Sequence, residues 1–253
     1  MSEALQPALS GKVVLITGAA RRLGAAMARR LHAEGAQLML HYRRSERDVQ
    51  ELQAELNAAR ADSVASLQAD LLDLAGLPEI VRNTVGRFGR LDALVNNAST
   101  FYATPLGEIT AEDWESLTGT NVKAPLFLSQ AAAPHLRRSG GCIVNITDIH
   151  AERPLKNYVV YTLAKAALAG LTRSLARELG PDVRVNAVAP GAVLWPEDGS
   201  YDDLTRQRVI SNTLLKRAGD PEDVARAVLY LIAHAPYVTG QIIAVDGGRS
   251  ISL

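Results

Sequence analysis

The sequence predicts an α/β fold, with one doubly wound parallel sheet of about seven strands and helices on both of its faces. Short runs rich in β-branched residues alternate with longer helical patterns along the 253 residues, as in strands joined by helical crossovers. Several of these runs are almost continuously apolar, which is typical of strands covered on both faces. No linker rich in Pro, Gly or Ser divides the alternation, so residues 1–253 are expected to form a single domain.

The expected elements follow one another in chain order. Strands are predicted at residues 12–17, 36–42, 63–68, 91–97, 141–147, 183–189 and 241–246. Residues 22–34, between the first two strands, have the pattern of a helix. A helix is also predicted at residues 161–179, because apolar residues recur there at steps of four and form one stripe. The stripe consists of Leu163, Ala167, Leu171, Leu175 and Leu179.

Composition argues against several classes of protein. The 27 basic residues balance 27 acidic ones, which argues against a nucleic-acid or membrane-surface partner. Five scattered histidines lack the spacing of a metal site. No long apolar stretch or signal peptide is evident, so a cytoplasmic protein is expected. Cys142 lies in the apolar run CIVNI and is expected to be a buried thiol.

A glycine-containing turn, TGAARRLG, connects the first strand to the first helix. Gly18 and Gly24 bracket this turn, where backbone amides and a helix N-terminus can hold a pyrophosphate. The pattern G-x-G-x-x-G is absent because Arg22 occupies its middle position. The turn therefore predicts a dinucleotide site, with an ordinary strand-to-helix turn as the alternative.

The end of the second strand, HYRRS, indicates which dinucleotide is bound. It offers Arg43, Arg44 and Ser45, with no acidic residue before Glu46. A carboxylate would hold the ribose 2′-hydroxyl of NAD but repel a 2′-phosphate, whereas a guanidinium and a hydroxyl bind that phosphate. NADPH is therefore the predicted cofactor, although a solvated basic turn would have the same composition.

Tyr161 and Lys165 lie one helical turn apart and share a helix face. A phenol has a pKa of about 10, and a nearby ammonium group lowers it. Tyr161 is therefore predicted to donate a proton with the help of Lys165. The alternative is a half-buried tyrosine beside a surface lysine.

Together with TGAARRLG, the motifs NNAS at 96–99 and Asn121 in GTNVKAPLF resemble the short-chain dehydrogenase/reductase family. The resemblance covers residues 11–248 and includes PG at 190–191 and VTGQIIAVDGG at 238–248. It implies a Rossmann-like fold, with Tyr161 as proton donor, Lys165 on the nicotinamide ribose and Asn121 in a proton relay. Asp70 would meet the adenine. The full set of implied cofactor contacts is Gly18, Arg22, Leu23, Gly24, His41, Arg43, Arg44, Ser45, Asp70, Leu71, Asn97, Ala98, Ser99, Tyr161, Lys165, Pro190 and Gly191.

Several departures from the family pattern resemble its pteridine reductase branch, which reduces the pterin ring of biopterin or folate with NADPH. Asp148 replaces the usual serine thirteen residues before Tyr161, Arg22 replaces a glycine, and NNAS followed by Thr100 and Phe101 replaces NNAG. HYRRS and the alanine of YTLAK are similar to the same branch.

Asp148 suits the reduction of a C=N bond better than that of a ketone. In a ketone reductase the serine donates a hydrogen bond to the developing oxyanion, which a carboxylate would repel. A reduced C=N nitrogen must instead gain a proton, so a carboxylate that polarises or reprotonates Tyr161 is useful there.

The substrate site is expected to hold a flat heterocycle. Phe101 would stack on the ring, or merely pack under its loop. The resemblance to the branch implies that Arg22 bridges the pyrophosphate and the polar edge of a pterin, with a phosphate contact alone as the alternative. Ser99 would touch cofactor or pterin, and Trp195 would line the pocket or pack in the core. The resemblance also implies a mobile cover at residues 191–215, and the acidic stretch PEDGSYDD suits such a cover.

The resemblance also implies a homotetramer, with helices near residues 111–136 and 158–179 at the interface and the tail RSISL near a neighbouring site. The leading hypothesis is an NADPH-dependent pteridine reductase acting on dihydropterins, dihydrofolate or their oxidised forms. A 3-oxoacyl thioester reductase is the alternative enzyme. A non-catalytic NADPH sensor is the third possibility, and the intact Tyr161, Lys165 and Asn121 argue against it.

Overall fold

The computed structural model describes residues 7–195 and 202–252. Its core is a seven-stranded parallel sheet in the order β3-β2-β1-β4-β5-β6-β7. The strands are β1 Val13–Ile16, β2 Gln37–Tyr42, β3 Val64–Gln68, β4 Ala93–Asn96, β5 Cys142–Ile146, β6 Arg184–Pro190 and β7 Ile242–Val245. All seven predicted strands are present, each within a residue or two of its expected bounds. The predicted doubly wound, Rossmann-like fold is confirmed.

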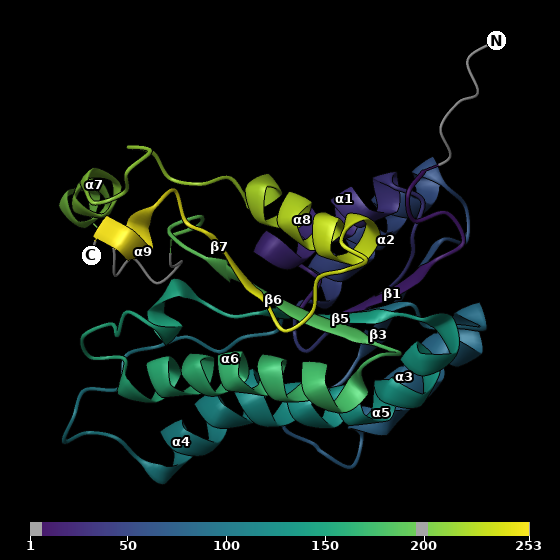
Figure 1. Cartoon of the computed structure of the whole chain (residues 1–253), viewed down its shortest axis with the longest axis horizontal. Helices are drawn as coiled ribbons and strands as arrows, with labels where there is room; N and C mark the ends of the chain where they lie inside the picture. The colour runs from purple at the N-terminus through teal and green to yellow at the C-terminus, as the bar shows by residue number, and fades with distance from the viewer. Residues whose placement is uncertain (1–6, 196–201, 253) are drawn as a thin grey trace.

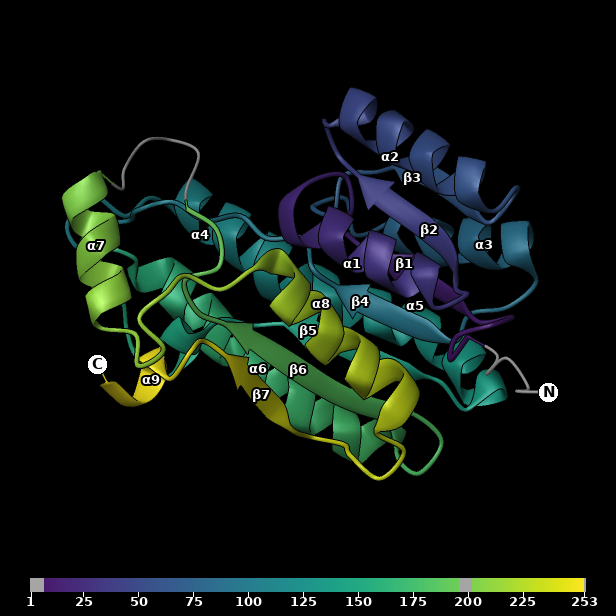
Figure 2. The ribbon, with the colours of Figure 1, turned by 90° about the horizontal axis from the view of Figure 1, so that it is seen from above.

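Helices cover both faces of this sheet (Figures 1 and 2). One face carries α1 (Arg22–Ala33), α2 (Glu46–Ala59) and α8 (Pro221–Leu229). The other carries α3 (Leu77–Phe88), α4 (Ala111–Thr118), α5 (Ala124–Ser139) and α6 (Val159–Leu179). The shorter elements are the helices α7 (Asp203–Ser211) and α9 (Arg249–Ser252), the π-helical turns η1 (Gly119–Lys123) and η3 (Tyr230–His234), and the 3₁₀ turn η2 (Ile149–Ala151).

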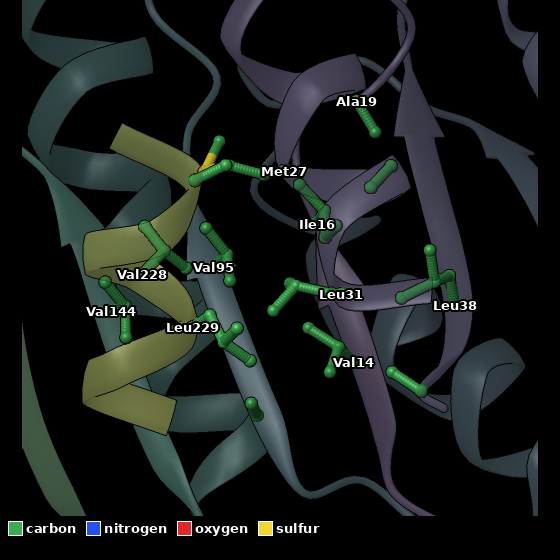
Figure 3. Close-up of a cluster of buried hydrophobic side chains, with 14 of the residues drawn as sticks. Val14, Ile16, Ala19, Met27, Leu31, Leu38, Val95, Val144, Val228 and Leu229 are labelled. Carbon is green, nitrogen blue, oxygen red and sulfur yellow. The ribbon is translucent and has the colours of Figure 1, made fainter. Parts of the chain in front are cut away.

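A separate apolar layer lies on each face of the sheet. Figure 3 shows the layer under α1 and α8, where Val14, Leu31 and Val228 are fully buried. The strands contribute to both layers because successive side chains of a strand point to opposite faces. Cys142 belongs to the layer in Figure 3 and is 2% exposed, as predicted. No helix in the described ranges is long and apolar enough to cross a membrane.

Helix α6 forms where the sequence predicts it, and its predicted apolar stripe passes from the surface into the core along the helix. Leu163 is 45% exposed, Leu171 and Leu175 are half-buried, and Leu179 is buried. The inner face also carries small and polar side chains, including Thr172, whose hydroxyl accepts a hydrogen bond from Asn145 of β5. The first part of the predicted stripe therefore lies at the surface and its last part in the core.

Candidate active site

A cavity of about 570 Å³ opens at the carboxyl ends of the strands. The strand order reverses between β1 and β4, and such a switch point is where open α/β sheets bind their ligands. Every residue predicted for the site lines this cavity, with the exception of Asn121.

The glycine turn is packed so closely that no side chain fits at its two glycines. Gly18 has a φ of +62°, and a Cβ there would lie 2.9 Å from Cα of Ala98. At Gly24 a Cβ would lie 2.8 Å from Cα of Ala19 and would also meet the carbonyl oxygen of Gly18. Nδ2 of Asn97 donates to the carbonyl oxygens of Thr17 (2.8 Å) and Gly18 (2.9 Å). A backbone held in this way, ahead of the N-terminus of α1, fits a pyrophosphate.

We expect Gly24→Ala to lower the free energy of unfolding by about 3 kcal/mol and to weaken NADPH binding at least tenfold, because the turn must open to admit the methyl group. Gly86→Ala is the matched control. A Cβ at this exposed position of α3 meets nothing within 4 Å, so alanine should stabilise the helix by up to about 1 kcal/mol. Denaturant unfolding and cofactor titration measure both variants. Wild-type cofactor binding by Gly24→Ala would contradict the tight turn.

His41 supports the glycine turn through hydrogen bonds at both ring nitrogens. The backbone N–H of Gly18 donates to its Nδ1 at 3.3 Å, and its Nε2 lies 3.1 Å from the carbonyl oxygen of Ala69. Nε2 must therefore carry the hydrogen, and the ring is neutral. Burial is the main cause that lowers its pKa to about 4. His41 was predicted as a cofactor contact; it lines the cavity, but its nitrogens hold the protein backbone.

We expect His41 to make stability and cofactor binding sensitive to acid. The folded pKa of about 4 lies below the ordinary 6.5, so the stabilisation is complete above pH 6.5 and is lost as the pH falls toward 4. The loss amounts to about 3 kcal/mol. Denaturant unfolding at several pH values should show this slope in wild type and not in His41→Gln. Parallel curves for the two proteins would refute the assignment.

The adenosine end of the cavity is lined by basic side chains. Arg43 forms an ion pair with Asp70 at 2.9 Å. Arg44 lies exposed beside Ser45 and has no ion pair within the described ranges. Arg21 also lines the cavity. Arg21 was not among the predicted site residues, although its place in the glycine turn was a usable signal. This group of cations fits a 2′-phosphate.

At the other end of the cavity, Asp148 and Tyr161 form a direct pair. Asp148 follows β5 and caps the turn η2, so its Oδ1 accepts the backbone N–H of His150 at 2.8 Å. Its Oδ2 accepts the Tyr161 hydroxyl at 2.7 Å. Lys165, one turn further along α6, is 2% exposed and donates to the carbonyl oxygen of Ile146 at 2.9 Å. The sequence correctly predicted that these three side chains come together.

The pKa values in this group differ from the expectation for Tyr161. Burial, and then the charge of Asp148, raise the pKa of Tyr161 well above 10, whereas the Ser99 hydroxyl acts in the opposite direction. The sequence predicted a lowered pKa because Lys165 is near, but its Nζ lies 5.7 Å from the ring centroid and the carboxylate is closer. Burial lowers the pKa of Lys165 to about 8, opposed by Asp148. Tyr161 is therefore fully protonated at neutral pH.

Asn121 lies beside the cavity rather than in its wall. It belongs to the π-helical turn η1, is 1% exposed, and donates through Nδ2 to the carbonyl oxygens of Thr100 (3.0 Å) and Leu117 (2.9 Å). Its Oδ1 accepts the Ser99 hydroxyl at 2.7 Å. All its polar atoms are engaged with the protein, so Asn121 fixes the loop that carries Ser99 and Thr100.

Phe101 and Trp195 bring aromatic rings to the wall of the cavity. The Phe101 ring stacks on Tyr158, with 4.6 Å between centroids, and meets Tyr161 edge to face. The carbonyl oxygen of Trp195 accepts a hydrogen bond from Arg22 at 3.0 Å, which links the glycine turn to the expected cover. Part of that cover, residues 196–201, lies outside the described residues.

Several further cavity residues were not among the predicted site residues, including His150, Val209 and Arg249. His150, two positions after Asp148, could have been found by its place on the same segment. Val209 of α7 lies within the segment 191–215 that was predicted as a cover, and Arg249 of α9 begins the tail RSISL, directly after the motif VTGQIIAVDGG. Within the described ranges, no three His, Cys, Asp or Glu side chains form a group that could hold a metal.

A family model described as enoyl-(acyl carrier protein) reductase matches residues 18–250. The chain belongs to the short-chain dehydrogenase/reductase family. Two curated relatives are equally similar to it. Pteridine reductase 1 of Leishmania tarentolae is 39% identical over 282 residues, covering 95% of this chain and 96% of its own. Granaticin polyketide synthase putative ketoacyl reductase 2 of Streptomyces violaceoruber is 39% identical over 245 residues, covering 94% and 96%.

A solved structure supports the cofactor class of this short-chain reductase independently of the sequence motifs. A blue fluorescent protein from a metagenomic library, in complex with NADPH, has a TM-score of 0.89 and 36% identity, covering 95% of this chain and 98% of its own. Together with family membership and the glycine turn, it shows that the cofactor is NAD(P)H.

Proposed function

We propose that this short-chain reductase is an NADPH-dependent pteridine reductase that reduces a C=N bond of a dihydropterin or dihydrofolate, and of the oxidised rings as well. The observation that carries the proposal is the 2.7 Å hydrogen bond between Asp148 and Tyr161. A serine at position 148 would suit a ketone oxygen. A carboxylate on the tyrosine hydroxyl suits a nitrogen that must be protonated.

NADPH, when bound, supplies the hydride that the carbon of the C=N bond accepts. The Tyr161 hydroxyl turns from Asp148 to the substrate nitrogen and gives it the proton, so that the C=N bond becomes CH–NH. Asp148 stabilises the hydroxyl before transfer and helps to return a proton to it afterwards. Lys165 lies beneath the Tyr161 ring and supports the charge that develops on its oxygen.

The backbone conformation of Arg22 is further support for a role of this residue in binding a heterocyclic substrate. Its φ of 53° lies in the left-handed region, which costs an arginine about 1 kcal/mol relative to a glycine. Strain of this kind persists at functional sites when the side chain is needed. We assign Arg22 to the pyrophosphate and the polar edge of the pterin. Phe101 and Trp195 border the ring, and Ser99 contacts it from the loop.

Arg44 is the residue that we expect to select NADPH over NADH. Its guanidinium has no ion pair within the described chain, whereas Arg43 is engaged with Asp70. Arg44→Ala should weaken NADPH binding about tenfold, because one charge-assisted contact to the 2′-phosphate is lost, and leave NADH binding unchanged. Fluorescence titration with each nucleotide measures this. An equal loss for both nucleotides would contradict the role.

Exposed apolar side chains on α5 and α6 support a homotetramer. Val159 and Leu163 of this helix and Phe127 of α5 are large apolar side chains that remain exposed on the same face of the sheet. We propose that α5 and α6 form the main interface. Light scattering of wild type and Leu163→Glu would test it, with a smaller particle expected for the variant.

The equally similar ketoacyl reductase makes 3-oxoacyl thioester reduction the second candidate. NADPH oxidation with dihydrobiopterin, dihydrofolate and acetoacetyl-CoA side by side separates the two. Turnover of a dihydropterin or of dihydrofolate supports the proposal. Turnover of the thioester alone would overturn it, and binding of NADPH without any turnover would favour a sensor.

A further inference from the structure

His150 lies in the cavity without having any role in the proton transfer described above. It sits in the turn η2, two residues after Asp148, and lines the same cavity as Asp148 and Tyr161. Its backbone N–H donates to Oδ1 of Asp148 at 2.8 Å, so its position is fixed relative to the carboxylate. The side chain is half-buried.

A backbone carbonyl determines which ring nitrogen of His150 carries a hydrogen. Nδ1 lies 2.7 Å from the carbonyl oxygen of Arg153. A carbonyl oxygen can only accept, so Nδ1 must donate, and in the neutral ring Nε2 is then an acceptor. Arg153 is itself anchored, because its Nε donates to the carbonyl oxygen of Ser250 at 2.9 Å. The orientation of the imidazole is therefore fixed from outside the cavity.

Nε2 of His150 is open to a ligand. It forms no hydrogen bond with any residue in the described ranges. It is not one of the buried polar atoms that lack a hydrogen-bond partner, so a ligand or solvent can reach it. Asp148 and His150 thus present two hydrogen-bond acceptors on one short segment of the cavity wall.

We propose that Nε2 of His150 accepts a hydrogen bond from an N–H group of the heterocyclic substrate, which makes His150 a specificity-determining residue. This inference rests on the proposed pteridine reduction. A pterin carries N–H donors on its ring and its amino group, and one of them satisfies this acceptor. The reacting end of a 3-oxoacyl thioester has carbonyl oxygens and no N–H group, so there an acceptor would face an acceptor. His150 and Asp148 therefore favour the same class of substrate.

The test compares His150→Phe with His150→Gln in the full-length enzyme. Phenylalanine keeps a planar ring and removes the acceptor, whereas glutamine restores an acceptor oxygen at a similar reach. Calorimetry gives the Kd of dihydrobiopterin for the enzyme with NADP⁺ bound, and NADPH oxidation gives KM and kcat. We expect His150→Phe to raise Kd and KM about tenfold and to leave kcat and the Kd of NADPH within about threefold. His150→Gln should bind dihydrobiopterin within about threefold of wild type.

The inference would be overturned if His150→Phe bound dihydrobiopterin with wild-type affinity. It would also be overturned if His150→Gln lost as much affinity for dihydrobiopterin as His150→Phe. Weaker NADPH binding in His150→Phe would assign the residue a structural role and would overturn it as well. Failure of the proposed function has a different signature, since wild type would then neither bind nor reduce dihydrobiopterin, and both proposals would fall.

Discussion

Tyr161→Phe is expected to lower kcat for dihydropterin reduction about 10³-fold, because the general acid that protonates the substrate nitrogen is lost. The phenol is well suited to this role, since burial and Asp148 keep its pKa well above 10 and its proton in place at neutral pH. Removing one oxygen atom leaves the ring packing beside Phe101 intact. NADPH binding should therefore stay within about threefold of wild type. Stopped-flow oxidation of NADPH and a cofactor titration measure the two quantities.

Tyr158→Phe is the matched control, with the same chemical change three residues earlier. Tyr158 stacks on Phe101 but does not line the cavity, so its loss of a hydroxyl should change kcat by less than about threefold. A Tyr161→Phe enzyme that keeps most of its pterin turnover would refute the assignment of the proton donor. Such a result would direct attention to Asp148 or to a water as the acid.

The sequence predicts the sheet well because the signal for a buried parallel strand is local. Runs such as VVLI in β1 and CIVNI in β5 are buried along their whole length, and their short length and β-branched residues distinguish them from buried helix segments. The order of strands, glycine turn and helix then places Gly18 and Gly24 at the edge where ligands bind. Hence much of the cavity wall was predictable, although residues such as Tyr42, Thr147 and Leu155 were not named as site residues from the sequence.

The remaining features depend on contacts that no local pattern encodes. The apolar stripe of α6 is one example, because its first member, Leu163, is exposed while Tyr161 and Lys165 take the inward positions of that turn. Arg249 lines the cavity of its own chain, whereas the tail that it begins was expected near a neighbouring site. The pKa of Tyr161 depends on burial, which spacing along a helix does not reveal.

Asp148→Ser is expected to weaken dihydropterin reduction and to strengthen the reduction of a 3-oxoacyl thioester. Dihydropterin turnover should fall about 10²-fold, because the carboxylate no longer assists Tyr161, while turnover of acetoacetyl-CoA should rise above the wild-type level. A serine hydroxyl can donate to a developing oxyanion, whereas an ionised carboxylate repels it. The substitution should also lower the pKa of Tyr161, since the charge of Asp148 and the hydrogen bond to it raise that pKa in wild type. Ultraviolet difference titration follows the phenolate independently of activity.

Asp148→Asn separates the charge of this side chain from its shape. The amide oxygen can still accept the His150 N–H and cap η2 as Oδ1 does now, so the local fold and NADPH binding should be retained. Without the negative charge, the Tyr161 pKa should fall as in the serine variant. Pterin turnover should fall about 10²-fold, and thioester turnover should not rise to the level of the serine variant, because the amide is a poorer match to the oxyanion position. Full pterin activity in Asp148→Asn would show that the carboxylate serves only as a cap, and the preference for C=N bonds would then have to come from the acceptor on His150 and from the cavity walls.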